Sequence, residues 1–274
     1  MILFVRKTAI DNGWQFKMVE EGGMFLTDFE WAPHLAKNHI LSETSLVPGS
    51  KVVESSGCNF HFASGILKDN NVKQRMKLLY DKSDDHRLDV RMLMMLVYIP
   101  AQDIPRVYDS VSNLLRDKES KALALLPRLS KYFVHGYERP SDNTTILPRF
   151  PPSMWSCFSR VLEDKPSTTN FLEGCHRGYD FKFMKNHPSF KDFGSCLAKD
   201  IKVIEKDIGL VNENKGNLVQ RKRKQELERT AAIKASCQEY NPNFTTEEVM
   251  DYLRNLAKIT SRTLRAAFIE DEDN

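Results

Sequence analysis

The pattern of apolar and polar residues predicts strands only near the start of the chain. Met24–Thr27 is a short apolar run after two glycines, and Lys51–Glu54 follows the turn pair Pro48-Gly49. Short apolar runs that are bounded by turn residues are typical of buried strands. A helix is expected between the two strands, over Glu30–Leu41. Residues 1–65 therefore form an α/β part.

From Cys58 onward the apolar spacing is helical. His86–Tyr98 is apolar on most sides, which predicts a central buried helix that ends before Pro100. Its methionines are expected to pack in the core rather than to line a binding groove. The next helix is predicted to open at Asp103, which is placed to cap it, with Pro105 in the first turn. The middle of the chain is therefore expected to be helical.

A proline-rich segment interrupts this helical pattern. Pro140–Pro152 holds four prolines among polar residues, which predicts an extended linker that divides the chain. Further helices are predicted over Trp155–Leu162, from Thr169-Asn170 onward, over Phe190–Ile208, and from Thr245, where Glu248 completes a capping box.

Composition limits the classes of function. The 274 residues are 41% hydrophobic and 28% charged, as in globular proteins, and the net charge of +3 does not by itself imply nucleic acid as a partner. No apolar run approaches the roughly 20 residues that span a bilayer, and no apolar signal region opens the chain. Five scattered cysteines indicate reduced thiols. We therefore expect an intracellular protein without a membrane partner.

Three short motifs could carry chemistry: Thr27–Glu30 (TDFE), Gly57–Phe62 (GCNFHF) and Thr168–Arg177 (TTNFLEGCHR). Asp28 stands where a helix cap belongs, and also where α/β enzymes place carboxylates at the end of a strand. Glu173 could form a capping pair with the preceding Asn170.

The other polar residues of these motifs also leave alternatives open. His176 and Arg177 share a helix face with Glu173, and that face could bind a metal or a phosphate, or could be solvated. Cys58 and His61 have the spacing of half a zinc site, but no second pair of this kind follows. A buried cysteine is therefore favoured over a structural zinc.

Taken in this order, and with RMLMMLVYIP and MW between them, the motifs resemble the Mutator-like (MULE) transposases, particularly the animal type. The similarity covers roughly residues 24–199. It implies a ribonuclease H-like core with a DDE triad and an all-helical insertion before the final Glu. It makes Asp28 the second acid and Glu173 the third, while Cys58 and His61 match the family's C-x2-H element. Such carboxylates hold Mg²⁺ or Mn²⁺ for strand cleavage.

The resemblance implies a mainly α protein with a partial α/β part. Its expected divisions are a partial ribonuclease H-like part over 1–65, a helical insertion over 66–139, a linker over 140–153, and a helical region over 154–274. The first acid of the triad should precede TDFE by several dozen residues on an apolar strand. Asp11 lacks such a strand. We therefore expect an N-terminally truncated, catalytically incomplete, transposase-derived protein with residual DNA binding.

Two alternatives remain open at this point. The chain could be a helical protein-interaction module of the host without nucleic-acid function, or a complete transposase whose recorded start is wrong. The basic run Arg221, Lys222, Arg223 and Lys224 could be a nuclear address or a phosphate contact, or a solvated helix face continued by Glu226. DNA is thus the expected partner, a nuclear location is suspected, and association with a second copy is left open.

Overall fold

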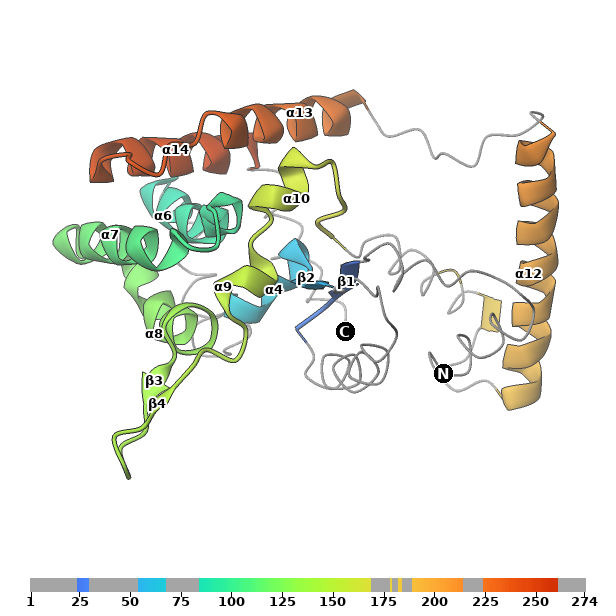
Figure 1. Ribbon diagram of the computed structural model, residues 1–274, viewed down its shortest axis with the longest axis horizontal. Coiled ribbons are helices and arrows are strands. Elements are labelled where there is room, and N and C mark those ends of the chain that lie inside the picture. Colours follow the sequence, from blue (N-terminus) through green and yellow to red (C-terminus); the bar gives the residue numbers. More distant parts are fainter. Residues whose placement is uncertain are drawn as a thin grey trace, which may run out of the picture. The chain divides into compact units, whose positions relative to one another are not determined.

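The computed structural model describes residues 24–29, 54–67, 84–168, 178, 182–183, 189–213 and 224–260. These residues are mainly helical, as predicted, with two short two-stranded sheets among them (Figure 1). The chain forms two compact units, one comprising Met1–Thr169 with Ala231–Asn274 and the other Asn170–Thr230. Within the described ranges, no helix has both the length and the apolar character needed to cross a membrane.

The first sheet is a parallel pair, β1 (Met24–Thr27) and β2 (Glu54–Gly57). The prediction of β1 is confirmed, although its residues are only partly buried. β2 ends three residues beyond the predicted Lys51–Glu54. Its last residue is glycine because a Cβ at position 57 would lie 2.4 Å from the Phe29 ring, and only glycine admits the ring against the strand.

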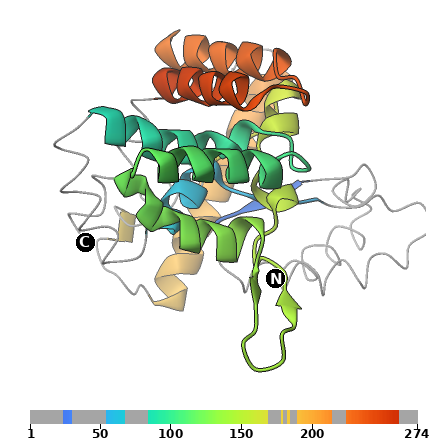
Figure 2. The ribbon, with the colours of Figure 1, turned by 90° about the vertical axis from the view of Figure 1, so that its left-hand side faces the viewer.

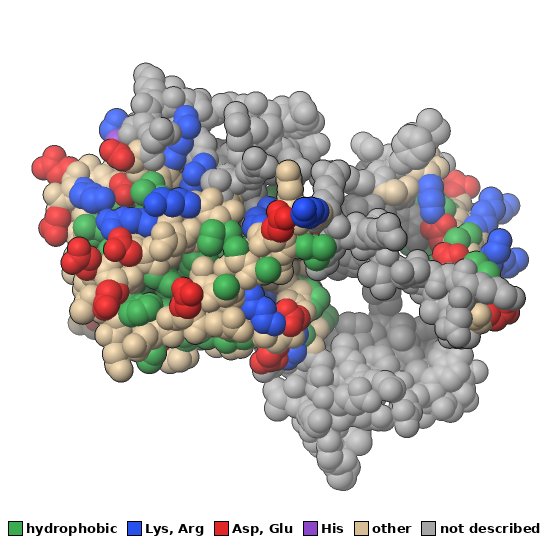
Figure 3. Space-filling model, turned by 90° about the horizontal axis from the view of Figure 1, so that it is seen from above, with side chains coloured by type: hydrophobic (Ala, Val, Ile, Leu, Met, Phe, Trp, Pro, Cys, Tyr) green, Lys and Arg blue, Asp and Glu red, His purple; other side chains and the backbone are tan. Residues whose placement is uncertain are grey.

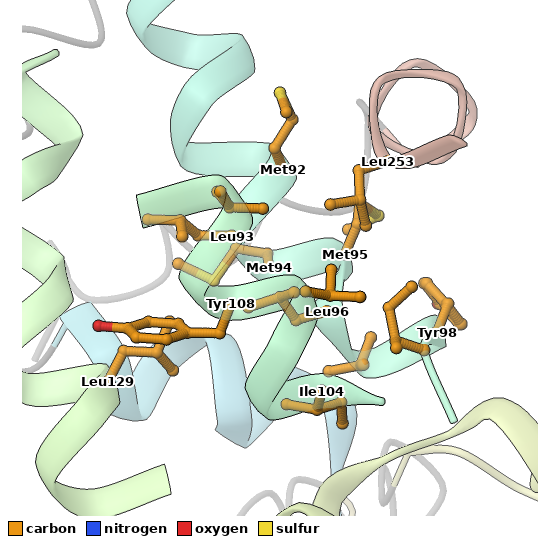
Figure 4. Close-up of a cluster of buried hydrophobic side chains, with 14 of the residues drawn as sticks. Met92, Leu93, Met94, Met95, Leu96, Tyr98, Ile104, Tyr108, Leu129 and Leu253 are labelled. Carbon is orange, nitrogen blue, oxygen red and sulfur yellow. The ribbon is translucent and has the colours of Figure 1, made fainter. Parts of the chain in front are cut away.

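The central helix predicted over His86–Tyr98 is confirmed as α6 (Asp84–Met94), which continues into the 3₁₀ turn η1 (Met95–Tyr98). Figure 4 shows its methionines among leucines and Ile104 of the following helix, α7 (Ile104–Asp117). Met92, Met94 and Met95 are at most 3% exposed, so they pack in the core as expected.

Asp103 precedes α7 as predicted, but its carboxylate makes no capping hydrogen bond. Instead it accepts a hydrogen bond of 3.0 Å from the Tyr240 hydroxyl. Nearby, Arg106 donates to the Pro242 carbonyl at 2.9 Å. The start of α7 is therefore tied to residues that lie about 140 positions later in the sequence.

Two late helices, α13 (Lys224–Gln238) and α14 (Thr246–Ile259), cover α6 and α7 (Figure 2). The predicted capping box is confirmed, since the Glu248 carboxylate accepts from the Thr245 amide at 2.7 Å and the Thr245 hydroxyl accepts from the Glu248 amide. The Tyr252 hydroxyl donates to the Tyr98 carbonyl at 2.8 Å, which joins α14 to the central helix.

Short elements connect α7 to the second half of the chain. In order, they are η2 (Lys121–Leu125), α8 (Leu126–Leu129), the π-helical turn η3 (Ser130–Val134), the antiparallel strands β3 (Tyr137–Glu138) and β4 (Thr145–Ile146), and the helices α9 (Pro152–Trp155) and α10 (Phe158–Leu162). The strands β3 and β4 form a hairpin that projects from the helical layers (Figures 1 and 2).

The segment predicted as a linker, 140–153, does not separate two units. Trp155, just after it, is fully buried, and its ring stacks on Phe62 of α4 (Asn59–Leu67) with centroids 4.3 Å apart. The indole N–H donates to the carbonyls of Phe133 at 3.0 Å and Phe150 at 3.1 Å. The prolines instead shape a hairpin and the start of a helix, and the large aromatic side chains pack that segment onto the core.

The compact units have other bounds than the predicted divisions. α4 runs continuously through the expected boundary at 65/66, because Ile66 and Leu67 are buried in the same core as the later helices. The predicted region 154–274 is shared between both compact units. The predicted helices over Glu30–Leu41 and from Thr169-Asn170 lie outside the described residues.

In the second unit, the long helix predicted near Phe190–Ile208 is confirmed as α12 (Phe190–Asn212). Lys182 pairs with Asp200 of α12 at 2.6 Å, and the rings of Phe183 and Phe193 lie 6.0 Å apart. Large apolar side chains of α12 that remain exposed are Phe190, Phe193, Leu197, Ile201, Val203 and Ile204.

Candidate functional site

The parallel strands bring the first two motifs together. β1 and β2 end at the same edge, since Thr27 lies opposite Gly57, so Asp28 and Cys58 follow the two strands side by side. The Cys58 amide donates to the Thr27 carbonyl at 2.8 Å, which extends the pairing beyond Gly57 to the second residue of the second motif. Asp28 is partly exposed at this edge.

The third motif begins at the same place. The Asn59 amide, at the start of α4, donates to the Ser167 carbonyl at 2.9 Å. Ser167 directly precedes the motif that starts at Thr168. Two backbone hydrogen bonds therefore connect three segments that are far apart in the sequence.

The predicted pairing of Asp28 with Glu173 stays a prediction. Glu173, His176 and Arg177 lie outside the described residues. Within the described parts of the chain, no group of three or more His, Cys, Asp and Glu side chains could hold a metal ion. The expectation of Mg²⁺ or Mn²⁺ therefore rests on the resemblance and on Asp28 at the strand edge.

Cys58 directly precedes α4, and His61 lies on the first turn of that helix. Cys58 is completely buried, and the His61 ring meets the Phe60 ring edge-on, with centroids 5.4 Å apart. Phe62, which follows His61, is buried and stacks on Trp155. The Cys58 position is thus a core position that fixes α4 to the strand edge.

Arg160 of α10 was missed by sequence reasoning. It is 5% exposed, and its Nη2 donates to the carbonyls of Gly57 at 3.0 Å and Ser156 at 3.2 Å. Its Nε and Nη1 are buried and have no hydrogen-bond partner within the described ranges. The only signal in the sequence is an arginine in a short helix that also carries Phe158, Val161 and Leu162. Arg160 therefore places a buried positive charge where β2 ends, and none of the described carboxylates pairs with it.

Arg160 also contacts a thiol. Its Nη2 lies 3.0 Å from the Cys157 Sγ. Burial raises the pKa of the Cys157 thiol to about 11, although the nearby Arg160 charge opposes this shift. Burial likewise raises the pKa of Cys237 to about 11. Because a nucleophilic cysteine needs its thiolate, these two thiols are suited to packing and not to catalysis.

The basic run is described only from Lys224 onward, because Arg221, Lys222 and Arg223 lie outside the described residues. Lys224 begins α13, its side chain is 90% exposed, and its Nζ lies 3.9 Å from the Glu228 carboxylate one helical turn later. This arrangement is that of a solvated helix face. A role of the run in phosphate contact or nuclear import stays a prediction.

Comparison with models of known protein families, with curated proteins and with solved structures found no match to this chain.

Proposed function

We propose that this chain is a transposase-derived, DNA-binding protein of the Mutator-like type, with a partial acidic site at the edge where β1 and β2 end. The observation that carries the proposal is the meeting of the first two motifs with the segment that leads into the third. Asp28 follows Thr27, Cys58 is hydrogen-bonded to Thr27, and Asn59 is hydrogen-bonded to Ser167. A DDE site of ribonuclease H-like form requires this convergence, because its acids come from separate segments.

The helices between the second and third motifs support the same proposal. The resemblance implies a helical insertion between the second acid and the final Glu. From Asp84 to Leu162 the described chain is helical apart from one hairpin, and it returns to the strand edge at Ser167. Asp28 and Glu173 would hold divalent ions weakly, since a pair of such ions is normally shared by more carboxylates. We therefore propose DNA binding together with weak metal binding.

The first test measures how the affinity for DNA depends on the salt concentration. Full-length protein is titrated into a labelled DNA duplex between 50 and 300 mM salt, roughly the range in which counterion release dominates. We expect the logarithm of the binding constant to fall linearly with that of the salt concentration, with a slope of roughly −0.9 per phosphate contact. Absence of binding at the lowest salt would refute the proposed function.

The second test concerns the acids. Mn²⁺ should raise the melting temperature of the parent protein slightly, because a ligand that binds only the folded state stabilises it. Asp28→Asn and Glu173→Gln should each abolish this shift. Asp117→Asn, an exposed acid at the end of α7, is the matched control and should keep it. An equal Mn²⁺ shift in all four proteins would place the ion elsewhere.

A second candidate function, a helical protein-interaction module, is favoured by α12. Its 23 residues carry apolar side chains every three or four positions, and Phe193, Leu197, Ile201 and Ile204 are between 38% and 55% exposed. Such a stripe is typical of helices that pair with another helix. In this alternative, α12 binds α12 of a second copy. Ile201→Gln should then lower the molecular mass of the particle measured by light scattering, whereas Lys202→Gln on the same helix should leave that mass unchanged.

A further inference from the structure

The hairpin β3–β4 has a fixed shape. Tyr137 pairs with Ile146, and the Arg139 amide donates to the Thr144 carbonyl at 2.9 Å. At its base, Gly136 has a φ of +82°, and a Cβ there would lie 2.0 Å from the Ile146 carbonyl oxygen. Only glycine fits this position. The hairpin is thus a projection of defined backbone shape, and it extends away from the helical layers in both Figure 1 and Figure 2.

Basic and aromatic side chains gather at the base of this projection, whereas the hairpin itself carries Arg139 together with Glu138 and Asp142. Residues 128–149 hold four Lys and Arg against two Asp and Glu. Lys131 Nζ lies 4.4 Å from the centre of the Tyr137 ring and 5.3 Å from that of Tyr132. Arg149 lies over Phe150 in the same way, at 5.7 Å. Tyr137 is 40% exposed, and the Arg139 side chain at the turn is 51% exposed.

The charges of this surface are only partly balanced within the protein. Arg139 pairs with Asp142 across the turn at 3.2 Å, which fixes its direction. Lys131 contacts the two tyrosine rings, and in the described part of the chain no carboxylate pairs with it. By contrast, acidic, basic and apolar side chains are interspersed on the face over α13 and α14 in Figure 3. Lys131, at the base of the hairpin, thus offers a positive charge next to the exposed part of Tyr137.

From this geometry we infer that the hairpin is a contact for single-stranded or locally unpaired DNA. A base would stack on the exposed part of Tyr137, while Lys131 and Arg139 would contact phosphates. Aromatic rings flanked by cations suit this ligand, since every base has a π-face and every nucleotide a negative phosphate. The inference rests on the proposed DNA binding and places it at a surface that is separate from the acidic edge.

The experiment compares a labelled single-stranded oligothymidylate of 20 nucleotides with a duplex of equal length, using full-length protein and fluorescence anisotropy. Tyr137→Ala should weaken binding of the single strand roughly 5- to 150-fold, the range for one lost stacked base. Tyr137→Phe, which keeps the ring, should bind as the parent does. Lys131→Gln should reduce the salt slope on the single strand by about 0.7, for one phosphate contact.

The control and the contrary outcomes separate this inference from the proposed function. Lys258→Gln removes an exposed charge from α14, on the opposite side of the unit from the hairpin, and should leave binding unchanged. If the parent binds DNA and the hairpin variants bind it equally well, the hairpin inference is overturned and the proposed function stands. If the parent binds no DNA, both fail. If an oligoglutamate peptide is bound as tightly and lost with the same variants, the site is a general anion surface and the inference is overturned.

Discussion

Substitution of Trp155 tests whether the proline-rich segment belongs to the core. Trp155→Phe removes the indole N–H that donates to the carbonyls of Phe133 and Phe150. A hydrogen bond whose buried acceptor is left unsatisfied costs about 1–3 kcal/mol. The smaller ring also leaves unfilled space beside Phe62, for about 1 kcal/mol more. We therefore expect Trp155→Phe to lower the free energy of unfolding by about 2–4 kcal/mol.

Urea unfolding followed by far-UV circular dichroism measures this change. Trp155→Ala should cost at least as much as Trp155→Phe, because it leaves a larger cavity, typically about 3–5 kcal/mol. Leu147→Ala is the control, since Leu147 lies in the same segment but is 77% exposed, and it should change stability by less than about 0.5 kcal/mol. If Trp155→Phe costs as little as Leu147→Ala, the segment does not pack on the core and the reasoning fails.

Two further predictions concern α14 and the buried thiols. Thr245→Ala removes the N-cap of α14 and should destabilise the protein by about 1 kcal/mol in urea unfolding, whereas Thr245→Ser should keep most of that stability. Alkaline pH should destabilise the fold, because burial raises the pKa of Cys157 and Cys237 to about 11, so the unfolded state releases these protons first. Stability should be constant below about pH 8.5 and fall by up to about 1.4 kcal/mol per pH unit and thiol between about 9 and 11. Cys157→Ala should make the free energy of unfolding fall less steeply with pH. An unchanged slope would contradict the assignment of this pH dependence to the buried thiols.

Local patterns in the sequence predicted the local features of the fold. The apolar spacing after Asp103 located α7, and the pair Thr245 and Glu248 located the start of α14 with its capping box. The dense apolar run over His86–Tyr98 predicted a buried central helix because such a helix has no face that favours water. These features depend on residues within one or two helical turns, so the sequence carries them directly.

Features that depend on distant partners could not be predicted in this way. Prolines in 140–153 indicated a linker, whereas the position of the segment depends on Trp155 meeting Phe62, 93 positions away in the sequence. Asp103 was correctly placed before α7, yet its hydrogen bond to Tyr240 depends on the later helices. The spacing of residues along the sequence does not predict such pairs, because which distant segments meet depends on how the whole core packs.

The candidate site was predictable only as a set of motifs. TDFE and GCNFHF each follow a strand, and the parallel pairing of these strands explains why Asp28 and Cys58 adjoin. That Ser167 also lies there could not be predicted from spacing, because it depends on the return of the chain after α10. Arg160 belongs to none of the sequence motifs. Its role follows from its hydrogen bonds to the carbonyls of Gly57 and Ser156, which form only in the folded chain.

The charge of Arg160 bears on what the acidic edge can do. Its guanidinium is buried, it touches the last carbonyl of β2, and two of its nitrogens lack partners among the described residues. A positive charge in a region of low dielectric constant disfavours a divalent cation nearby and favours an anion. Asp28 adjoins this region through the Thr27–Cys58 hydrogen bond. Weak metal binding is therefore the expected state of this edge, and the same charge favours the approach of a carboxylate or a phosphate. Both consequences are what the proposed function expects of this edge.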